Sequence, residues 1–182
     1  MKIETTEIPD VKHIEPRVFG DDRGFFLEMW RAERLGEMGI DAPLIQVNHS
    51  RSSRGVLRGL HYQIRQPQGK LVSVINGAIF DVAVDVRRNS DTYGRWVGRE
   101  LSDRNSAMLW IPKGFAHGFL TLSDSADVLY ACTDYYSPDG ERAIIWNDPD
   151  LGIAWPLDNG LKPIVSGKDR QGSPFSAAEV FP

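Results

Sequence analysis

The residues of this sequence best suited to chemistry are two histidines and a lysine. His61 lies in the stretch Arg58-Gly59-Leu60-His61-Tyr62-Gln63, and Lys70 follows seven residues after its end. The alternation of side chains predicts a half-buried strand with Gly59, His61 and Gln63 on one face and Leu60 and Tyr62 on the other. His117 follows Pro112 and Gly114, which predict a tight turn before the chain re-enters a strand. Two histidines held in this way predict one shared pocket.

The spacing around these residues resembles the two motifs of the cupin superfamily, whose members bind a metal through histidines and a glutamate. Gly55-x5-His61-x-Gln63-x6-Lys70-x6-Gly77 resembles the first motif, and Pro112-x-Gly114-x-x-His117 resembles the second. By this resemblance Gln63 stands in the place of the second histidine and Lys70 in the place of the glutamate.

These two substitutions predict a cavity without metal or other cofactor. An ammonium group has the same sign of charge as a metal cation, and an amide oxygen is a weak replacement for an imidazole. In a partly desolvated pocket, however, the ammonium of Lys70 can stabilise a developing oxyanion, while His61 can take a proton near neutral pH. That combination suits proton transfer at a carbon beside a carbonyl.

The pattern along the rest of the chain predicts one all-β domain, residues 1–182. From Leu44 onward short alternating segments are separated by turns, as expected for an antiparallel sandwich or barrel. The predicted strands are Leu44–His49, Val56–Gln63, Lys70–Ile75, Ala78–Arg87, Trp96–Leu101, Ala107–Ile111, His117–Leu122, Val128–Tyr136 and Ala143–Trp146.

The segments on either side of this region are less regular. Val11–Phe19 and Phe25–Trp30 are predicted strands, and Ala32–Met38 is a predicted short helix that ends at Gly39. After Trp146 the chain is predicted to be loop, with a charged, exposed segment at Ser166–Arg170 judged by composition alone.

Two aspartates in the predicted strand Ala78–Arg87 have two possible environments. Phe80, Val82, Val84 and Val86 form an apolar row that should face the core, and Asp81 and Asp85 lie on the opposite row. The aspartates are either solvated, or Asp81 faces a polar cavity inside a barrel and holds a histidine.

Composition excludes several classes of function. The formal net charge is -4 and the pI about 5.6, which argues against a nucleic-acid-binding surface. The single cysteine, Cys132, cannot form an internal disulfide, and no apolar run reaches the length of a signal peptide or a membrane span. We therefore expect a cytoplasmic protein with no membrane contact.

Several separated motifs together resemble the dTDP-4-dehydrorhamnose 3,5-epimerase (RmlC) family of the cupin superfamily, from about Ile8 to Asp169. The resemblance rests on the stretch around His61, on Gly69-Lys70-Leu71-Val72 and on five further motifs. These are Phe19-Gly20-Asp21-Asp22-Arg23-Gly24-Phe25-Phe26, Gln46-Val47-Asn48-His49-Ser50, Trp110 to Phe119, Thr133-Asp134-Tyr135-Tyr136-Ser137-Pro138 and Trp146-Asn147-Asp148.

The resemblance implies a cupin-type jelly-roll homodimer that needs no cofactor and acts on a dTDP-sugar. Such an enzyme inverts C3 and C5 of dTDP-4-dehydro-6-deoxy-D-glucose on the route to dTDP-L-rhamnose. By similarity His61 is the base, Asp169 pairs with it, Lys70 stabilises the enolate and Tyr130 is the acid on the other face. Without the resemblance, Asp169 would be an ordinary solvated charge and Tyr130 an aromatic residue of the core.

The same resemblance implies the residues that bind the substrate. Arg23, Lys168 and Arg58 are candidates to bind the diphosphate, and Phe19 and Tyr136 are candidates to stack on the thymine. The other matching positions are Glu28, Gln46, Asn48, His117 and Glu141. Arg58 and His61 differ by three positions, so they share a face only if a bulge at Gly59 interrupts the strand.

Three other functions fit parts of this pattern. A relative that inverts only C3 or only C5, or moves the ketone, would share most of the pocket. A metal-dependent cupin oxygenase would need a metal where Gln63 and Lys70 stand. A non-catalytic module would bind the sugar nucleotide without removing its protons.

Overall fold

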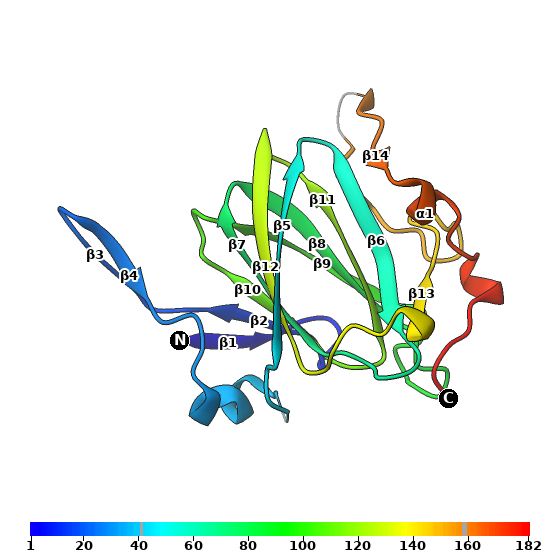
Figure 1. The fold of residues 1–182 in the computed structure, drawn as a ribbon, viewed down its shortest axis with the longest axis horizontal. Coiled ribbons are helices and arrows are strands. Elements are labelled where there is room, and N and C mark those ends of the chain that lie inside the picture. The colour runs from blue at the N-terminus through cyan, green and yellow to red at the C-terminus, as the bar shows by residue number, and fades with distance from the viewer. Residues whose placement is uncertain (41, 158–159) are drawn as a thin grey trace.

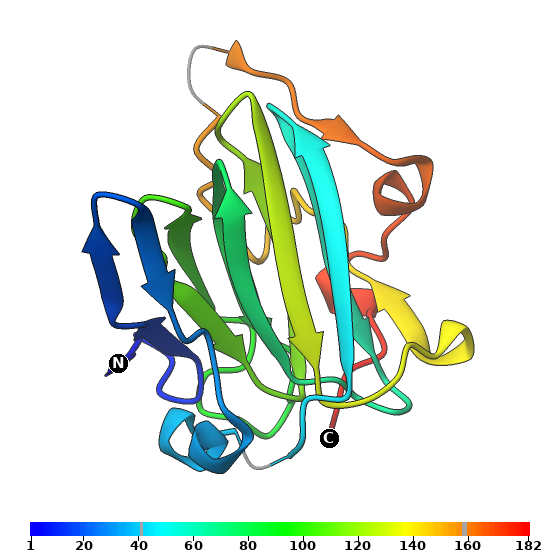
Figure 2. The same ribbon diagram turned by 60° about the vertical axis from the view of Figure 1, so that its left-hand side comes forward.

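Two antiparallel sheets form the body of the protein in a computed structural model that describes residues 1–40, 42–157 and 160–182. The first sheet has the order β1-β2-β10-β7-β12-β5 and the second the order β13-β6-β11-β8-β9, with β14 parallel to β6 (Figures 1 and 2). The strands of the first sheet are β1 (Lys2–Thr5), β2 (Lys12–Glu15), β5 (Gln46–Ser53), β7 (Lys70–Asn76), β10 (Met108–Ile111) and β12 (Ser125–Cys132). Those of the second are β6 (Val56–Gln63), β8 (Ala78–Asp85), β9 (Trp96–Ser102), β11 (Phe115–Thr121), β13 (Glu141–Ala143) and β14 (Ile164–Val165).

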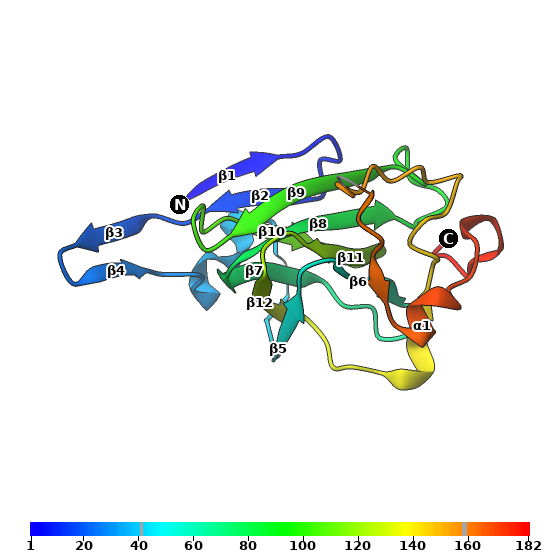
Figure 3. The same cartoon turned by 90° about the horizontal axis from the view of Figure 1, so that it is seen from above.

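The remaining elements are short. β3 (Val18–Asp21) and β4 (Gly24–Leu27) form a separate hairpin, and α1 (Gly167–Arg170) is a single helical turn. Short 3₁₀ helices span Ala32–Met38, Pro138–Gly140 and Phe175–Ala177. Figure 3 shows the hairpin extending from one end of the molecule and α1 at the opposite end. In the described part of the chain, no helix has the length and apolar character needed to cross a bilayer.

The two sheets pack face to face, and a second apolar layer covers the outside of each. Between the sheets lie side chains from β7 to β12, including Val72, Ile79, Leu109 and Val128. The outer face of the second sheet packs under the C-terminal segment, and the outer face of the first sheet packs against the Ala32–Met38 helix. The prediction of an antiparallel jelly roll is confirmed.

Most predicted strands are confirmed to within a few residues, and Val56–Gln63 matches β6 in full. The single strand predicted over Val11–Phe19 is wrong, because Pro16 and Arg17 separate β2 from β3 and a proline has no N–H to donate to a ladder. The strand predicted over Phe25–Trp30 ends at Leu27. The predicted helix Ala32–Met38 is present as a 3₁₀ helix, and Gly39 ends it with φ of 76°.

The row of apolar residues predicted in β8 is buried, but on the outer side of its sheet. Val82, Val84 and Val86 pack with Leu151 and Trp155 of the C-terminal segment. The opposite face of β8 therefore points between the two sheets, and its polar residues lie in the interior of the protein.

Candidate active site

Two adjoining cavities lie between the sheets and share three residues. The larger has a volume of about 500 Å³ and the smaller about 240 Å³. His61, Lys70 and Tyr130 line both. The point where the cavities meet is therefore the candidate reaction centre.

The first sheet supplies one wall of this centre. Across β7, β12 and β5, Lys70 pairs with Cys132 and Cys132 with Gln46, and in the next row Val72, Tyr130 and Asn48 are paired in the same way. Side chains of directly opposed residues point to the same face of a sheet. Because the rows are two residues apart, Lys70 and Tyr130 both face the interior.

The second sheet supplies the opposite wall, where His61 on β6 is paired with His117 on β11. From this pair to the pair of Arg58 with Phe119, the chain advances three residues on β6 but two on β11. This extra residue is the predicted bulge, and it allows Arg58 and His61 to line the same cavity. Gly59 is required there, since a Cβ at this position would lie 2.5 Å from Cα of Gly118.

Asp169 reaches His61 from the C-terminal segment. Asp169 Oδ1 lies 2.5 Å from His61 Nε2, and the aspartate is only 3% exposed, which corrects the expectation from composition that this segment is wholly solvated. Burial alone would raise the pKa of Asp169, but the His61 imidazole, the Ser166 hydroxyl and the Gly59 N–H hold it below its ordinary value. A carboxylate on Nε2 fixes the proton on that nitrogen and leaves the other ring nitrogen free to act as a base.

Lys70 and Tyr130 are both affected by burial. Desolvation lowers the pKa of Lys70, although Cys132, Asp81 and Glu141 act in the opposite direction. Desolvation also raises the pKa of Tyr130, which keeps its hydroxyl protonated. In the described parts of the chain no carboxylate forms an ion pair with Lys70, so its ammonium can interact with an anion in the cavity.

The two aspartates of β8 are both fully buried, so the solvated alternative is wrong for each. Asp81 Oδ1 lies 2.7 Å from Nε2 of His117, which is the second alternative that the sequence left open. Asp85 accepts hydrogen bonds from Arg87, Ser90 and Thr92 outside the cavity. The interior therefore contains two separate histidine–aspartate pairs.

Seven of the ten predicted substrate-binding residues line the cavities. Arg58, His117 and Lys168 line the larger cavity. The smaller, mostly polar cavity is lined by Gln46, Asn48, Tyr136 and Glu141. Tyr136 donates a hydrogen bond of 2.7 Å from its hydroxyl to Glu141, and Lys168 forms an ion pair with the same carboxylate.

The other three predicted residues, Phe19, Arg23 and Glu28, do not reach these cavities within one chain. Phe19 and Arg23 belong to the β3–β4 hairpin, which pairs with no other strand among the described residues and extends away from the sheets (Figure 1). Arg23 pairs with Asp21 of its own turn, and Glu28 pairs with Arg31 at 2.7 Å.

Sequence reasoning did not single out three residues that line the larger cavity or adjoin the site. Ser50, two residues beyond Asn48 on β5, has a buried hydroxyl without a partner in the described part of the protein. Period-two spacing from Gln46 and Asn48 could have identified it. Cys132 is buried across the strand from Lys70, and Ser166 bonds the backbone of Asp169. The pairing of Cys132 with Lys70 is a tertiary contact that the sequence does not reveal, whereas a serine three residues before an aspartate is a local helix-start signal that could have identified Ser166.

The positions that hold a metal in other cupins do not fit one here. The Gln63 side chain is engaged by a loop, because its amide oxygen accepts from Ser137 N at 2.9 Å and its nitrogen donates to Gln66 O at 2.7 Å. Lys70 adds a cation instead of a carboxylate ligand.

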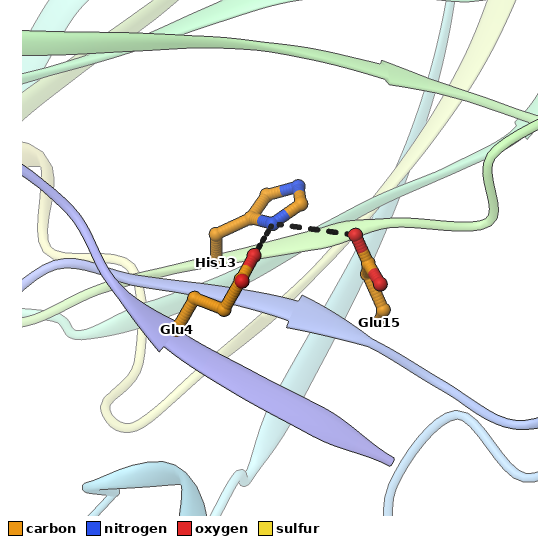
Figure 4. Close-up of side chains that lie close together, drawn as sticks. All are labelled: Glu4, His13 and Glu15. Carbon is orange, nitrogen blue, oxygen red and sulfur yellow. Dashed lines mark ion pairs between the residues drawn. The ribbon is translucent and has the colours of Figure 1, made fainter.

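Among the described residues, one group of three potential metal ligands lies elsewhere. It consists of Glu4, His13 and Glu15 on β1 and β2 (Figure 4). Lys2 already binds Glu4 at 2.8 Å there, and the group takes no part in either cavity.

Comparison with known proteins identifies close relatives over the whole chain. The family model described as dTDP-4-dehydrorhamnose 3,5-epimerase matches residues 5–177. An enzyme of that name from Pseudomonas aeruginosa is 56% identical over 183 residues, covering 100% of both chains, and one from Escherichia coli is 52% identical, covering 94% of this chain and 92% of its own.

Solved structures agree with these relatives. The epimerase of Legionella pneumophila in complex with dTDP-4-keto-L-rhamnose superposes with a TM-score of 0.94 at 51% identity, covering 98% of this chain and 94% of its own. ChmJ, a 3'-monoepimerase of Streptomyces bikiniensis in complex with dTDP-quinovose, has a TM-score of 0.89 at 36% identity, with coverage of 96% and 88%.

Proposed function

The chain belongs to the dTDP-4-dehydrorhamnose 3,5-epimerase family, and we propose that the residues around its two cavities carry out the reaction of that family. The protein is an isomerase. It inverts C3 and C5 of dTDP-4-dehydro-6-deoxy-D-glucose to give dTDP-4-dehydro-L-rhamnose in dTDP-L-rhamnose biosynthesis. The observation that supports the assignment of roles is that His61, bonded to Asp169, lies across one cavity from Lys70 and Tyr130.

The C4 ketone makes the hydrogens on C3 and C5 acidic. His61 removes one of these protons, and the electron pair of the broken C–H bond moves to the ketone oxygen as an enolate. Lys70 stabilises that oxygen, and Tyr130 returns a proton to the carbon from the opposite face. Base and acid on two different sheets suit an inversion, because the proton must leave from one face and arrive at the other.

The two cavities also suggest how the substrate is divided between them. The larger cavity contains Arg58 and Lys168, whose donors suit the diphosphate. The smaller cavity offers the side-chain amides of Gln46 and Asn48 together with the ring of Tyr136, which suit the thymidine. His117 and Glu141 contact the substrate at the edges of this arrangement.

We further propose that the protein acts as a homodimer in which each hairpin completes the site of the other chain. Phe25 and Phe26 on β4 are each 69% exposed, and they border an apolar groove of about 300 Å³ that also includes Val74 and Ile75 of the first sheet. Burial of such a surface against a second copy is favourable. It would also bring Phe19, Arg23 and Glu28 to a cavity that they cannot reach within their own chain. A cytoplasmic location remains part of this proposal, supported by the free, buried Cys132.

Mixing two impaired variants tests the shared site. Arg23→Ala and His61→Ala should each be weakly active alone but recover activity together, because a mixed dimer then has one site with both residues intact. If each chain completes its own site, mixing restores nothing. Sedimentation should show a dimer for both variants, and a monomeric wild-type protein would contradict the proposal.

Turnover of the dTDP-4-keto sugar in D₂O tests the reaction and the role of His61. Deuterium should enter at both C3 and C5, and incorporation at one carbon alone would indicate a mono-epimerase. His61→Ala should lower turnover by at least about 100-fold, the usual scale for a general base, while dTDP still binds. His13→Ala is a matched control, since His13 lies outside both cavities.

A further inference from the structure

Asp169 is held against His61 by a very short element. Asp169 lies 108 residues after His61 in the sequence and belongs to α1, a helix of four residues (Figure 1). A helix of this length is not stable by itself, because nucleation costs more than a single turn returns. The position of the Asp169 carboxylate must therefore come from contacts around the helix.

The chain is anchored on both sides of α1. Before the helix, β14 pairs with β6, and its Val165 is buried in the outer apolar layer. After the helix, Ser173 accepts from Ile145 N at 3.0 Å and donates to Ala143 O at 2.9 Å through its backbone. These anchors hold the ends of the segment, but neither bonds to Asp169.

Ser166 makes the contact that the two anchors do not. Its hydroxyl oxygen accepts a hydrogen bond of 3.0 Å from the backbone N–H of Asp169, and its carbonyl accepts one of 3.0 Å from Arg170. Ser166 is thus the N-cap of α1. The Asp169 N–H is attached to the Cα that carries the carboxylate, so this bond fixes the direction in which the side chain leaves the backbone.

We infer that Ser166 is a positioning residue for the reaction: its hydroxyl holds the first turn of α1 so that Asp169 meets His61. The inference rests on the proposed role of His61 as the base. Without the hydroxyl, the Asp169 N–H loses its partner and the turn opens more often. Because Asp169 fixes the proton on one nitrogen of His61, each opening leaves the base with its ring and tautomer unspecified.

A matched pair of variants isolates the hydroxyl. Ser166→Thr keeps a capping oxygen, whereas Ser166→Val has nearly the same shape as threonine without it. Loss of an N-cap should lower kcat by about 3- to 10-fold in Ser166→Val, with KM within about twofold, and Ser166→Thr should stay close to wild type. Ser166→Ala gives a second cap-free variant if the valine impairs folding.

A spectroscopic measurement tests the same point without turnover. The imidazole proton shared between His61 and Asp169 should give a far-downfield NMR resonance, which Ser166→Val should broaden and Ser166→Thr should keep. Equal kcat and equal resonances in the valine and threonine variants would overturn the inference. An increase in KM alone would also overturn it, since it would mean that the hydroxyl, which lines the larger cavity, contacts the substrate.

Asp169→Asn separates this inference from the proposed function. If Asp169→Asn loses turnover and Ser166→Val does not, the role of Ser166 is wrong and the role of Asp169 stands. If Asp169→Asn turns over at the wild-type rate, the proposed pairing of base and carboxylate is wrong, whatever Ser166 does.

Discussion

Replacing Lys70 with methionine should weaken catalysis and strengthen the fold at the same time. Lys70 projects from β7 into the cavity, and burial lowers the pKa of its ammonium. The nearby carboxylates Asp81 and Glu141 are bound to His117 and Lys168. Methionine has a similar length and no charge, so Lys70→Met removes the cation with little change in packing.

The two effects can be estimated separately. Loss of one donor to a developing oxyanion costs about 10²- to 10³-fold in kcat, or roughly 3–4 kcal/mol of transition-state stabilisation. Replacing an unpaired, partly buried charge by an apolar side chain should raise the free energy of unfolding by about 1–2 kcal/mol. For a chain of this length, each kcal/mol corresponds to about 2–4 °C in Tm.

The pH dependence of stability tests whether the charge of Lys70 destabilises the fold. Because the pKa of Lys70 in the folded state lies below its unfolded value of about 10.4, the unfolded chain binds more protons between these two values. The stability of the wild type should therefore rise with pH through that window. Lys70→Met lacks this contribution, so its advantage in Tm should be largest at neutral pH and shrink as the solution becomes alkaline.

Thermal unfolding at neutral and alkaline pH, together with turnover of the dTDP-4-keto sugar, checks both effects. Binding of dTDP should be retained and shows that the cavity is intact. A Lys70→Met variant that is less stable than wild type at neutral pH would refute the argument, since it would mean that the ammonium is well satisfied before substrate binds. A kcat within about tenfold of wild type would refute the role in stabilising the enolate.

Three further changes test other parts of the site. Tyr130→Phe should lower inversion by about 10²-fold or more while His61 still exchanges the substrate's protons with solvent, which NMR in D₂O can follow. Asp85→Asn should lower the free energy of unfolding by about 3 kcal/mol by leaving Arg87 without its buried partner. Because the pKa of Asp85 is lowered in the folded protein, its contribution to stability is present above about pH 4 and is lost as the pH falls further. Between pH 4 and more acidic solutions, the Tm of Asp85→Asn should therefore depend less on pH than the Tm of the wild type. Dialysis against a chelator should leave kcat unchanged, because the ammonium of Lys70 is no metal ligand; activity restored only by added metal would contradict this.

The sequence predicted the strands well where one face of a strand is buried along its whole length. Val56–Gln63 is such a case, because the alternation of side chains placed Leu60 and Tyr62 on one face, and both are buried in the outer apolar layer. The sequence did not predict strands, or the buried face of a strand, where contacts between distant parts of the chain determine them. β14 has two residues and exists because β6 offers it an edge, and the β8 valines are buried by a C-terminal segment with no regular pattern of its own.

The site shows the same division. His61, Lys70 and His117 lie on strands, and the spacing of the two motifs that contain them was enough to predict one shared pocket. Asp169 lies in a charged, irregular segment that composition alone predicts to be solvated, and its burial depends on the docking of α1 against β6. The family motif identified Phe19 and Arg23 but could not reveal that a single chain keeps them outside its cavity.

The arrangement of charges explains how a fold that often holds a metal can stabilise an anion instead. The buried aspartates Asp169 and Asp81 are each bonded to a histidine, and neither forms an ion pair with Lys70 or Arg58 in the described part of the chain, although the charge of Asp81 still favours the protonated form of Lys70. Among the described residues, Lys70 and Arg58 are cavity-lining cations without a carboxylate partner; Arg58 donates to the neutral Ser52 hydroxyl at 3.0 Å. If Lys70 were already paired with a carboxylate, that ion pair would have to be broken or shared when the enolate forms. The energy of the ion pair would then be subtracted from the stabilisation of the transition state. Leaving the cation unpaired lowers the stability of the fold but makes its full charge available to the reacting oxygen.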